Sequence, residues 1–256
     1  MATVKQIRDY INGFAPEDSA ESYDNVGIIL GSGQEEVTGI LLCVDVTAER
    51  VAEAEAAGAN LIISHHPLIF EGLKKINPQG SEKALCEAVK KGMAVIAAHT
   101  NADKMQGSMS ELIAAELGAE KVGPLTEDGI GIIADIPRAT LKRIKEKLSA
   151  FTGDGQIKTA GGQENVVSRL AVVSGSGGRD RALLESAIDG GADLYISGEF
   201  RHDLLLWAKG KIMLMEISHY GSEKSFSDIM FDRLKPCFGG KIIKSVTETS
   251  PYDKEM

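Results

Sequence analysis

The stretch AAGANLIISHHP, residues 56–67, has a counterpart later in the chain in DGGADLYISGEF, residues 189–200. In both stretches a predicted helix ends at Gly-Ala and a short apolar strand follows, at Leu61–Ser64 and at Leu194–Ser197. A strand and a helix also precede each stretch, so this faint repeat predicts two related halves of the βαβ type. Open sheets built from such units bind ligands at the carboxyl ends of their strands.

The rest of the chain alternates short apolar runs with helical stretches, which is typical of an α/β protein. Several runs are continuously apolar, as in strands of a sheet that helices cover on both faces. We therefore expect two related α/β lobes with mixed sheets flanked by helices. The first lobe is predicted over residues 1–126 and the second over 127–256, with a C-terminal segment that could pack back on the first. A single helix is predicted over Ser222–Leu234.

Length and composition exclude several classes of protein. The 256 residues are 43% hydrophobic and 25% charged, ordinary values for a soluble chain of one or two domains. Neither a membrane span nor a signal peptide is apparent, because every apolar run is well short of the ~20 residues that a span needs. The net charge of −9 disfavours a nucleic-acid partner. Three widely spaced cysteines fit a reducing cytoplasm: Cys43, Cys86 and Cys237.

Every histidine of the chain follows a predicted strand directly or lies in the polar stretch after it. The adjacent pair His65-His66 lies between the strand end at Ser64 and Pro67, which favours a bend there. Such a bend is needed because neighbouring strand residues normally point to opposite faces. An isolated His-His pair would also fit one surface imidazole and one hydrogen-bonded core imidazole. The five histidines are His65, His66, His99, His202 and His219.

The donor types near these histidines suggest a metal site. His219 and Glu223 are four residues apart, so they share one face if that segment is helical. Asp103 follows another predicted strand. Imidazole and carboxylate donors suit zinc, iron and manganese. An isolated His-x-x-x-Glu would be incidental more often than not. With His65 and His66, however, the set predicts two divalent ions that share Glu223 as a bridge.

Five segments together resemble the GTP cyclohydrolase type 2 homologue family, also called the NIF-three-like family, over nearly the whole chain. The segments are DNVGIIL (24–30), LIISHHPLIF (61–70), AAHTNAD (97–103), GADLYISGE (191–199) and ISHYGSE (217–223). The resemblance implies a two-domain α/β subunit, a dinuclear metal centre in the interdomain cleft and a toroidal homohexamer. Carried over by position, the family's metal ligands fall on His65, His66, Asp103, His219 and Glu223. The chain departs from the family at Tyr23, where Trp is frequent, and at Ala102, where Leu is frequent.

Other polar residues near the predicted strand ends are candidates for supporting roles. His99 could orient a metal ligand by a hydrogen bond, or could be a buried histidine that the backbone satisfies. Glu199 and His202 could act as general acid or base or contact the substrate, or be an ordinary helix-start glutamate and a surface histidine. The loop Gly175–Gly178 could offer backbone N–H groups to a phosphate, although a plain glycine turn fits better without the lysine of a P-loop.

Charge arithmetic points to the class of substrate. Two divalent ions bring +4 and the two carboxylates −2, which leaves an electropositive site in an acidic protein. Such a site favours small anions such as phosphates and nucleotides. We expect a metal-dependent hydrolase of a small anionic or nucleotide-like substrate, GTP cyclohydrolase-like by resemblance. Two alternatives are a non-catalytic protein for metal storage, delivery or sensing, and a scaffold that its metals only stiffen.

Overall fold

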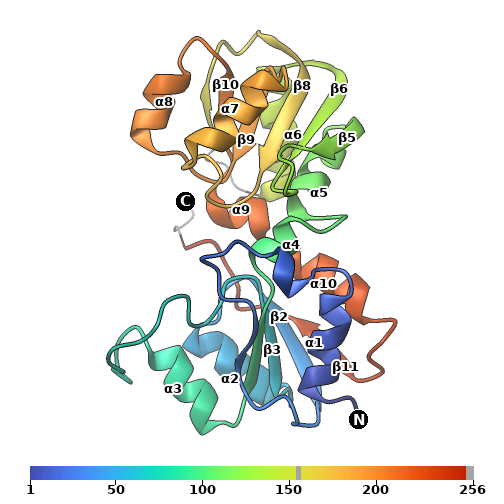
Figure 1. Ribbon diagram of the computed structural model, residues 1–256, viewed down its shortest axis with the longest axis vertical. Coiled ribbons are helices and arrows are strands. Elements are labelled where there is room, and N and C mark those ends of the chain that lie inside the picture. The colour runs from blue at the N-terminus through green and yellow to red at the C-terminus, as the bar shows by residue number, and fades with distance from the viewer. Residues whose placement is uncertain (154–156, 252–256) are drawn as a thin grey trace. The chain divides into compact units, whose positions relative to one another are not determined.

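The computed structural model describes residues 1–153 and 157–251 and divides into two compact units (Figure 1). Unit 1 consists of Met1–Met105 and Ser225–Ser250, and unit 2 contains Gln106–Lys224. Each unit holds one mixed sheet with helices on both faces, which confirms the predicted fold class. None of the helices in the described part of the chain combines the length and apolarity that crossing a membrane requires.

The sheet of unit 1 has five strands in the order β1-β4-β3-β2-β11. Strands β4, β3, β2 and β11 are parallel, and β1 runs antiparallel at the edge beside β4. Because β2, β3 and β4 are buried along their whole length, their sequences are almost continuously apolar. The strands are β1 (Gly27–Leu30), β2 (Gly39–Cys43), β3 (Leu61–Ser64), β4 (Ala94–Ala97) and β11 (Lys241–Lys244).

Helices cover both faces of this sheet. On one face, Leu41 and Ile62 of the sheet pack against Val51 of α2 and Ala88 of α3. On the other face lie α1 and α10 (Figure 1). A further short helix, α4, follows β4 directly. The helices of unit 1 are α1 (Val4–Asn12), α2 (Ala48–Ala56), α3 (Lys83–Lys90), α4 (Thr100–Asp103), α10 (Phe226–Leu234) and the 3-10 turn Glu17–Ser19.

Unit 2 contains a six-stranded sheet in the order β5-β6-β8-β9-β10-β7. Its centre, β8, β9 and β10, is parallel, whereas β6, β5 and β7 run antiparallel to their neighbours. The strands are β5 (Glu120–Pro124), β6 (Ile132–Thr140), β7 (Lys158–Ala160), β8 (Val166–Val173), β9 (Leu194–Ser197) and β10 (Met213–Glu216).

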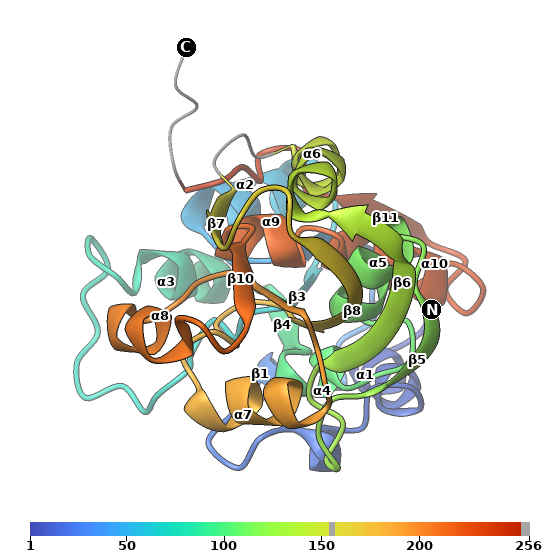
Figure 2. The same ribbon diagram turned by 90° about the horizontal axis from the view of Figure 1, so that it is seen from above.

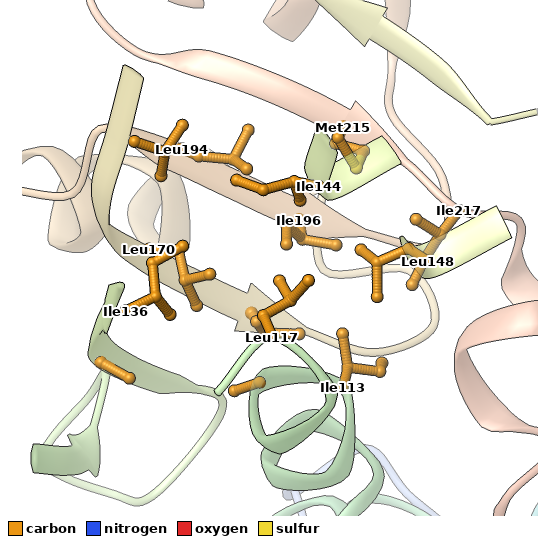
Figure 3. Close-up of a cluster of buried hydrophobic side chains, with 14 of the residues drawn as sticks. Ile113, Leu117, Ile136, Ile144, Leu148, Leu170, Leu194, Ile196, Met215 and Ile217 are labelled. Carbon is orange, nitrogen blue, oxygen red and sulfur yellow. The ribbon is translucent and has the colours of Figure 1, made fainter. Parts of the chain in front are cut away.

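The core of unit 2 has two layers, one on each face of the sheet. Ile113 of α5 and Leu148 of α6 pack against Leu170 and Ile196 (Figure 3). Helices α7 and α8 cover the opposite face, and Figure 2 shows α6 and α7 on opposite sides of the strands. Each fully buried aliphatic side chain contributes about 1.5–3 kcal/mol. The helices are α5 (Met109–Glu116), α6 (Leu141–Thr152), α7 (Arg181–Asp189), α8 (His202–Ala208) and α9 (His219–Glu223).

Two of the differences between the predicted and the observed elements have an evident cause. The helix predicted over Ser222–Leu234 is two helices, α9 and α10, with a break at Lys224 and Ser225. At this break the chain passes from unit 2 back into unit 1. Strands β5 and β7 were not predicted, because both are largely exposed strands at a sheet edge and neither contains an apolar run.

Candidate metal centre

Three imidazoles meet at the strand ends of unit 1. His65 and His66 follow β3 directly, and His99 lies two residues after β4. Their ring centroids are 5.1 to 5.4 Å apart, and one potential ligand atom from each lies within 4.8 Å of the others. The predicted bend is present, since the Ser64 hydroxyl donates a hydrogen bond of 2.7 Å to the His66 carbonyl. The bend allows neighbouring residues to turn their rings toward one site.

An acceptor holds the Nδ1 atom of each ring. His65 Nδ1 lies 3.0 Å from the carbonyl oxygen of Ala98. His66 Nδ1 lies 2.8 Å from Asp45 Oδ1, and His99 Nδ1 lies 2.8 Å from Asp24 Oδ1. A carbonyl or an ionised carboxylate can only accept, so each Nδ1 donates the hydrogen bond, and in a neutral ring Nε2 is then the nitrogen with the lone pair that can bind a metal. This arrangement of outer partners is typical of metal-binding histidines.

Asp24 is the more deeply buried of the two carboxylate partners, with a fully buried side chain. Its carboxylate accepts hydrogen bonds from His99 and from both the N–H and the hydroxyl of Thr100. Burial alone would raise the pKa of Asp24, but these hydrogen bonds outweigh burial and hold the pKa well below its usual range. Asp24 is therefore ionised at neutral pH and keeps the orientation of His99.

Asp103, the carboxylate predicted for this half, ends the short helix α4. Its Oδ1 atom lies 4.0 Å from His65 Nε2. This is the other ring nitrogen from the one that contacts the Ala98 carbonyl. The Asp103 side chain is 18% exposed and that of His65 is fully buried. Unit 1 therefore brings His65, His66 and His99 together and places the carboxylate of Asp103 near His65.

Unit 2 presents the other two predicted donors on α9. His219 begins this helix and Glu223 ends it, which confirms the helical spacing expected from the sequence. His219 Nε2 lies 3.2 Å from Glu223 Oε2, and the Glu223 side chain is only 3% exposed. Ser218, just before the helix, has a φ of 61°, and its side chain accepts a hydrogen bond from Gly221 N. A left-handed serine costs about 1–3 kcal/mol, a strain that is often found at functional sites.

The glycine loop Gly175–Gly178 has a steric role next to Glu223. Its backbone N–H groups at Gly175 and Gly178 donate to the hydroxyls of Ser222 and Ser197, at 2.9 Å each, and so are already used. A Cβ on Gly175 would overlap Glu223 Oε1 and would lie 3.4 Å from His219 Nε2. The structure therefore favours the glycine-turn interpretation over phosphate binding. The loop leaves room for the two donors of α9.

The two candidates for acid–base chemistry lie in different surroundings. Glu199 Oε1 is 3.7 Å from His219 Nδ1 and 3.4 Å from Arg179 Nη1. His202 is exposed at the first residue of α8. Glu199 therefore lies on the Nδ1 side of His219, a proposed ligand. Asp45 and Asp24 lie on the same side of the His66 and His99 rings in unit 1.

Asp24 and Asp45 were not predicted as partners of the imidazoles. Asp24 is 75 residues from His99 in sequence, and Asp45 is 21 residues from His66. The available signal was their position, since each is a carboxylate adjoining a predicted strand. Position alone does not identify the histidine that each would contact.

Fold and donor groups together define a two-unit α/β protein with candidate metal-binding side chains at the carboxyl ends of its strands. The chain belongs to the Duf34/NIF3 (NGG1p interacting factor 3) family, whose family model matches residues 2–251. This confirms the family resemblance of the sequence.

Named relatives and solved structures agree with this membership. A Lactococcus lactis protein named GTP cyclohydrolase 1 type 2 homolog is 31% identical over 249 residues, which cover 93% of this chain and 94% of the relative. A Helicobacter pylori protein named GTP cyclohydrolase 1 type 2 is 30% identical, with 91% of this chain and 92% of the relative covered. The crystal structure of a Staphylococcus aureus hypothetical protein matches with a TM-score of 0.90 at 23% identity, and 99% of each chain is covered. This structural likeness shows the fold.

Proposed function

We propose that this protein is a metal-dependent hydrolase of a small anionic or nucleotide-like substrate, with two divalent ions held jointly by its two halves. The observation that carries the proposal is the oriented imidazole cluster of unit 1, in which an acceptor holds each Nδ1 atom. The names of the two bacterial relatives support a GTP cyclohydrolase-like reaction. The proposed ligands are His65, His66, Asp103, His219 and Glu223.

The donor set fits the proposed ions. Imidazole nitrogens and carboxylate oxygens suit zinc, iron and manganese, and availability decides between them. Five protein ligands shared by two ions leave coordination positions open, as a catalytic site requires. Ions bound there would lower the pKa of a bound water and polarise the bond under attack. The joint site, the homohexameric ring and the cytoplasmic location rest on the resemblance and on composition, and they belong to the proposal.

Side chains around the ligands have supporting roles in this proposal. Asp45 orients the imidazole of His66 through its contact with Nδ1, which leaves Nε2 as the nitrogen that would bind an ion. Glu199, 3.7 Å from His219 Nδ1, can orient that ring or accept a proton at the edge of the site. His202, exposed on α8, is the second candidate for proton transfer or substrate contact.

Chelation distinguishes the hydrolase from its alternatives. We expect a chelator to abolish hydrolysis in a screen of nucleotides and cyclic amides while the circular dichroism spectrum stays unchanged. Loss of the folded spectrum on chelation would favour a scaffold that its metals stiffen. Bound and exchangeable ions without turnover of any substrate would favour metal storage, delivery or sensing.

Asp103→Asn tests the ligand set within this experiment. The amide is a much weaker metal ligand than the carboxylate, so the variant should lose at least one ion per chain and most of the hydrolysis. Asp228→Asn is the matched control, because Asp228 is exposed on α10 and pairs with Lys244 at 2.5 Å. Elemental analysis measures the number of metal ions per chain in both variants. Undiminished metal in the Asp103 variant would contradict the assignment.

A further inference from the structure

Two exposed aromatic rings lie beside the imidazole cluster of unit 1. Tyr23 is 66% exposed and Phe70 is 45% exposed. Their ring centroids are 6.4 Å apart with an angle of 59° between the planes. Phe70 also meets His99 edge-on, at 6.1 Å and 83°. Large apolar rings this exposed contribute little to folding, and grouped exposed rings often mark a binding surface.

The rings are held in place by their sequence neighbours. Asp24, directly after Tyr23, is buried and binds His99 and Thr100. Asn25 donates a hydrogen bond of 2.5 Å from its side-chain amide to the carbonyl of Ile69, the residue before Phe70. The backbone next to each ring is therefore tied to the imidazole cluster or to the other ring's segment. Such pre-positioned rings bind a ligand with little further loss of conformational entropy.

We propose that Tyr23 and Phe70 form a stacking surface for the planar heterocyclic ring of a nucleotide-like substrate next to His99. This inference rests on the proposed function and specifies which part of the substrate unit 1 recognises. Nucleobases stack on aromatic side chains in a way that tolerates different bases, because every base has a π-face. The contact between Phe70 and His99 places this surface at the edge of the proposed metal ligands.

The phenol of Tyr23 is uncharged and can take part in stacking as a neutral ring. Partial burial and the carboxylates of Glu21, Asp24 and Asp103 raise the pKa of Tyr23, so its phenol is neutral at physiological pH. A neutral phenol offers both an apolar face and a hydrogen-bond donor.

The experiment compares two ligands that differ only in the heterocycle. Guanosine 5′-monophosphate carries a base, and ribose 5-phosphate has the same sugar and phosphate without one. Binding of each to the full chain is measured by calorimetry, with and without added zinc. We expect Tyr23→Ala and Phe70→Ala each to weaken the nucleotide about 5- to 100-fold and to leave ribose 5-phosphate unchanged. Tyr23→Phe should retain the affinity, because the ring remains.

Tyr10→Ala is the matched control. Tyr10 is 40% exposed and meets Phe14 at 5.9 Å and 77° in the same unit. Its loss should leave both affinities unchanged. Equal binding of the two ligands by the wild type, or a Tyr23 variant with undiminished nucleotide affinity, would overturn the proposal. So would a change of sedimentation in the Tyr23 and Phe70 variants without a change in nucleotide binding, which would make the pair a contact between copies of the chain.

The two proposals fail in different ways. Absence of bound metal and of hydrolysis would refute the proposed function, while discrimination between the two ligands could persist without zinc. Loss of discrimination in a metal-loaded, active protein would refute only the stacking surface. Elemental analysis of every variant separates these outcomes, because Tyr23 and Phe70 are outside the proposed ligand set and their variants should keep the wild-type metal content.

Discussion

The sheets of the two units contain the same arrangement of four strands, but the residues directly after their central strands differ. In unit 1 the parallel strands β2, β3 and β4 have the antiparallel β1 at their edge, and in unit 2 β8, β9 and β10 have the antiparallel β7. The central strands end at Ser64 and Ser197. His65 and His66 come after the first, whereas Gly198 and Glu199 come after the second.

The difference between His65 and Gly198 has a steric cause. A Cβ on Gly198 would lie 2.5 Å from the carbonyl oxygen of Gly175 and 2.8 Å from the Cα of His219. Helix α9 thus approaches the strand end of unit 2 so closely that a side chain does not fit. In unit 1 the residue directly after the central strand is His65, whose buried ring packs against Phe226 with 5.1 Å between the ring centroids. Equivalent strand ends can therefore carry a ligand in one half and require glycine in the other.

Gly198→Ala should have the largest effect on this comparison. The methyl group would overlap backbone atoms that cannot rotate away, so we expect the free energy of unfolding to fall by about 3 kcal/mol. Gly123→Ala, at a site with no atom within 4 Å of the added carbon, is the control and should change it by less than about 1 kcal/mol. Urea unfolding at 25 °C measures both. Equal stability of the two variants would show that the close approach of α9 is not real.

Gly175→Ala sharpens the comparison at the donors of unit 2. The added methyl group overlaps Glu223 Oε1, so this carboxylate must leave its present position beside His219. We expect zinc affinity to fall roughly 10- to 100-fold, as when the support of a metal ligand is removed. Gly210→Ala controls for backbone strain, because Gly210 also has a positive φ of 77° but has no atom within 4 Å. A similar affinity for both variants in a zinc titration would show that Gly175 does not support the donors.

Substitutions just before the central strands should have a smaller effect on the free energy of unfolding. Asn60 Oδ1 accepts a hydrogen bond from Thr38 N at 2.9 Å, and Asp193 Oδ2 accepts from Ser168 N and Arg169 N at 2.8 and 3.0 Å. Burial raises the pKa of Asp193, but these hydrogen bonds outweigh it and lower the pKa below its ordinary value. A depressed pKa stabilises the fold above the unfolded-state pKa of about 3.9, and this stabilisation is lost as the pH falls.

Asp193→Asn should therefore lower the free energy of unfolding by about 1 kcal/mol at pH 7, with less difference from wild type below about pH 4. Asp189→Asn, at the exposed end of α7, should show neither change. Urea unfolding at the two pH values gives the result. A difference between Asp193→Asn and wild type that grows in acid would mean that the folded state raises this pKa instead of lowering it.

Much of the fold could be predicted because its central strands are continuous apolar runs with clear ends. Leu61–Ser64 and Leu194–Ser197 agree with β3 and β9 at both bounds. Edge strands such as β7 gave no signal, because they bury little apolar surface. The break between α9 and α10 was missed, because local helical pattern does not reveal where a chain passes between units.

The features of the candidate site that depend on local sequence could also be predicted, whereas those that depend on distant contacts could not. Spacing alone predicted that His219 and Glu223 share a helix face, and the flanks of His65 and His66 predicted their bend. The roles of Asp24 and Gly175 could not be predicted. The first depends on a contact between distant segments, and the second on space that only the folded loop defines.

Anomalous X-ray diffraction from crystals grown with zinc tests the central claim most directly. We predict two anomalous peaks per chain, with His65, His66, Asp103, His219 and Glu223 as their protein ligands. Zinc-replete crystals without a peak at the imidazoles of unit 1, or with every ion held by other residues, would contradict the proposed metal centre.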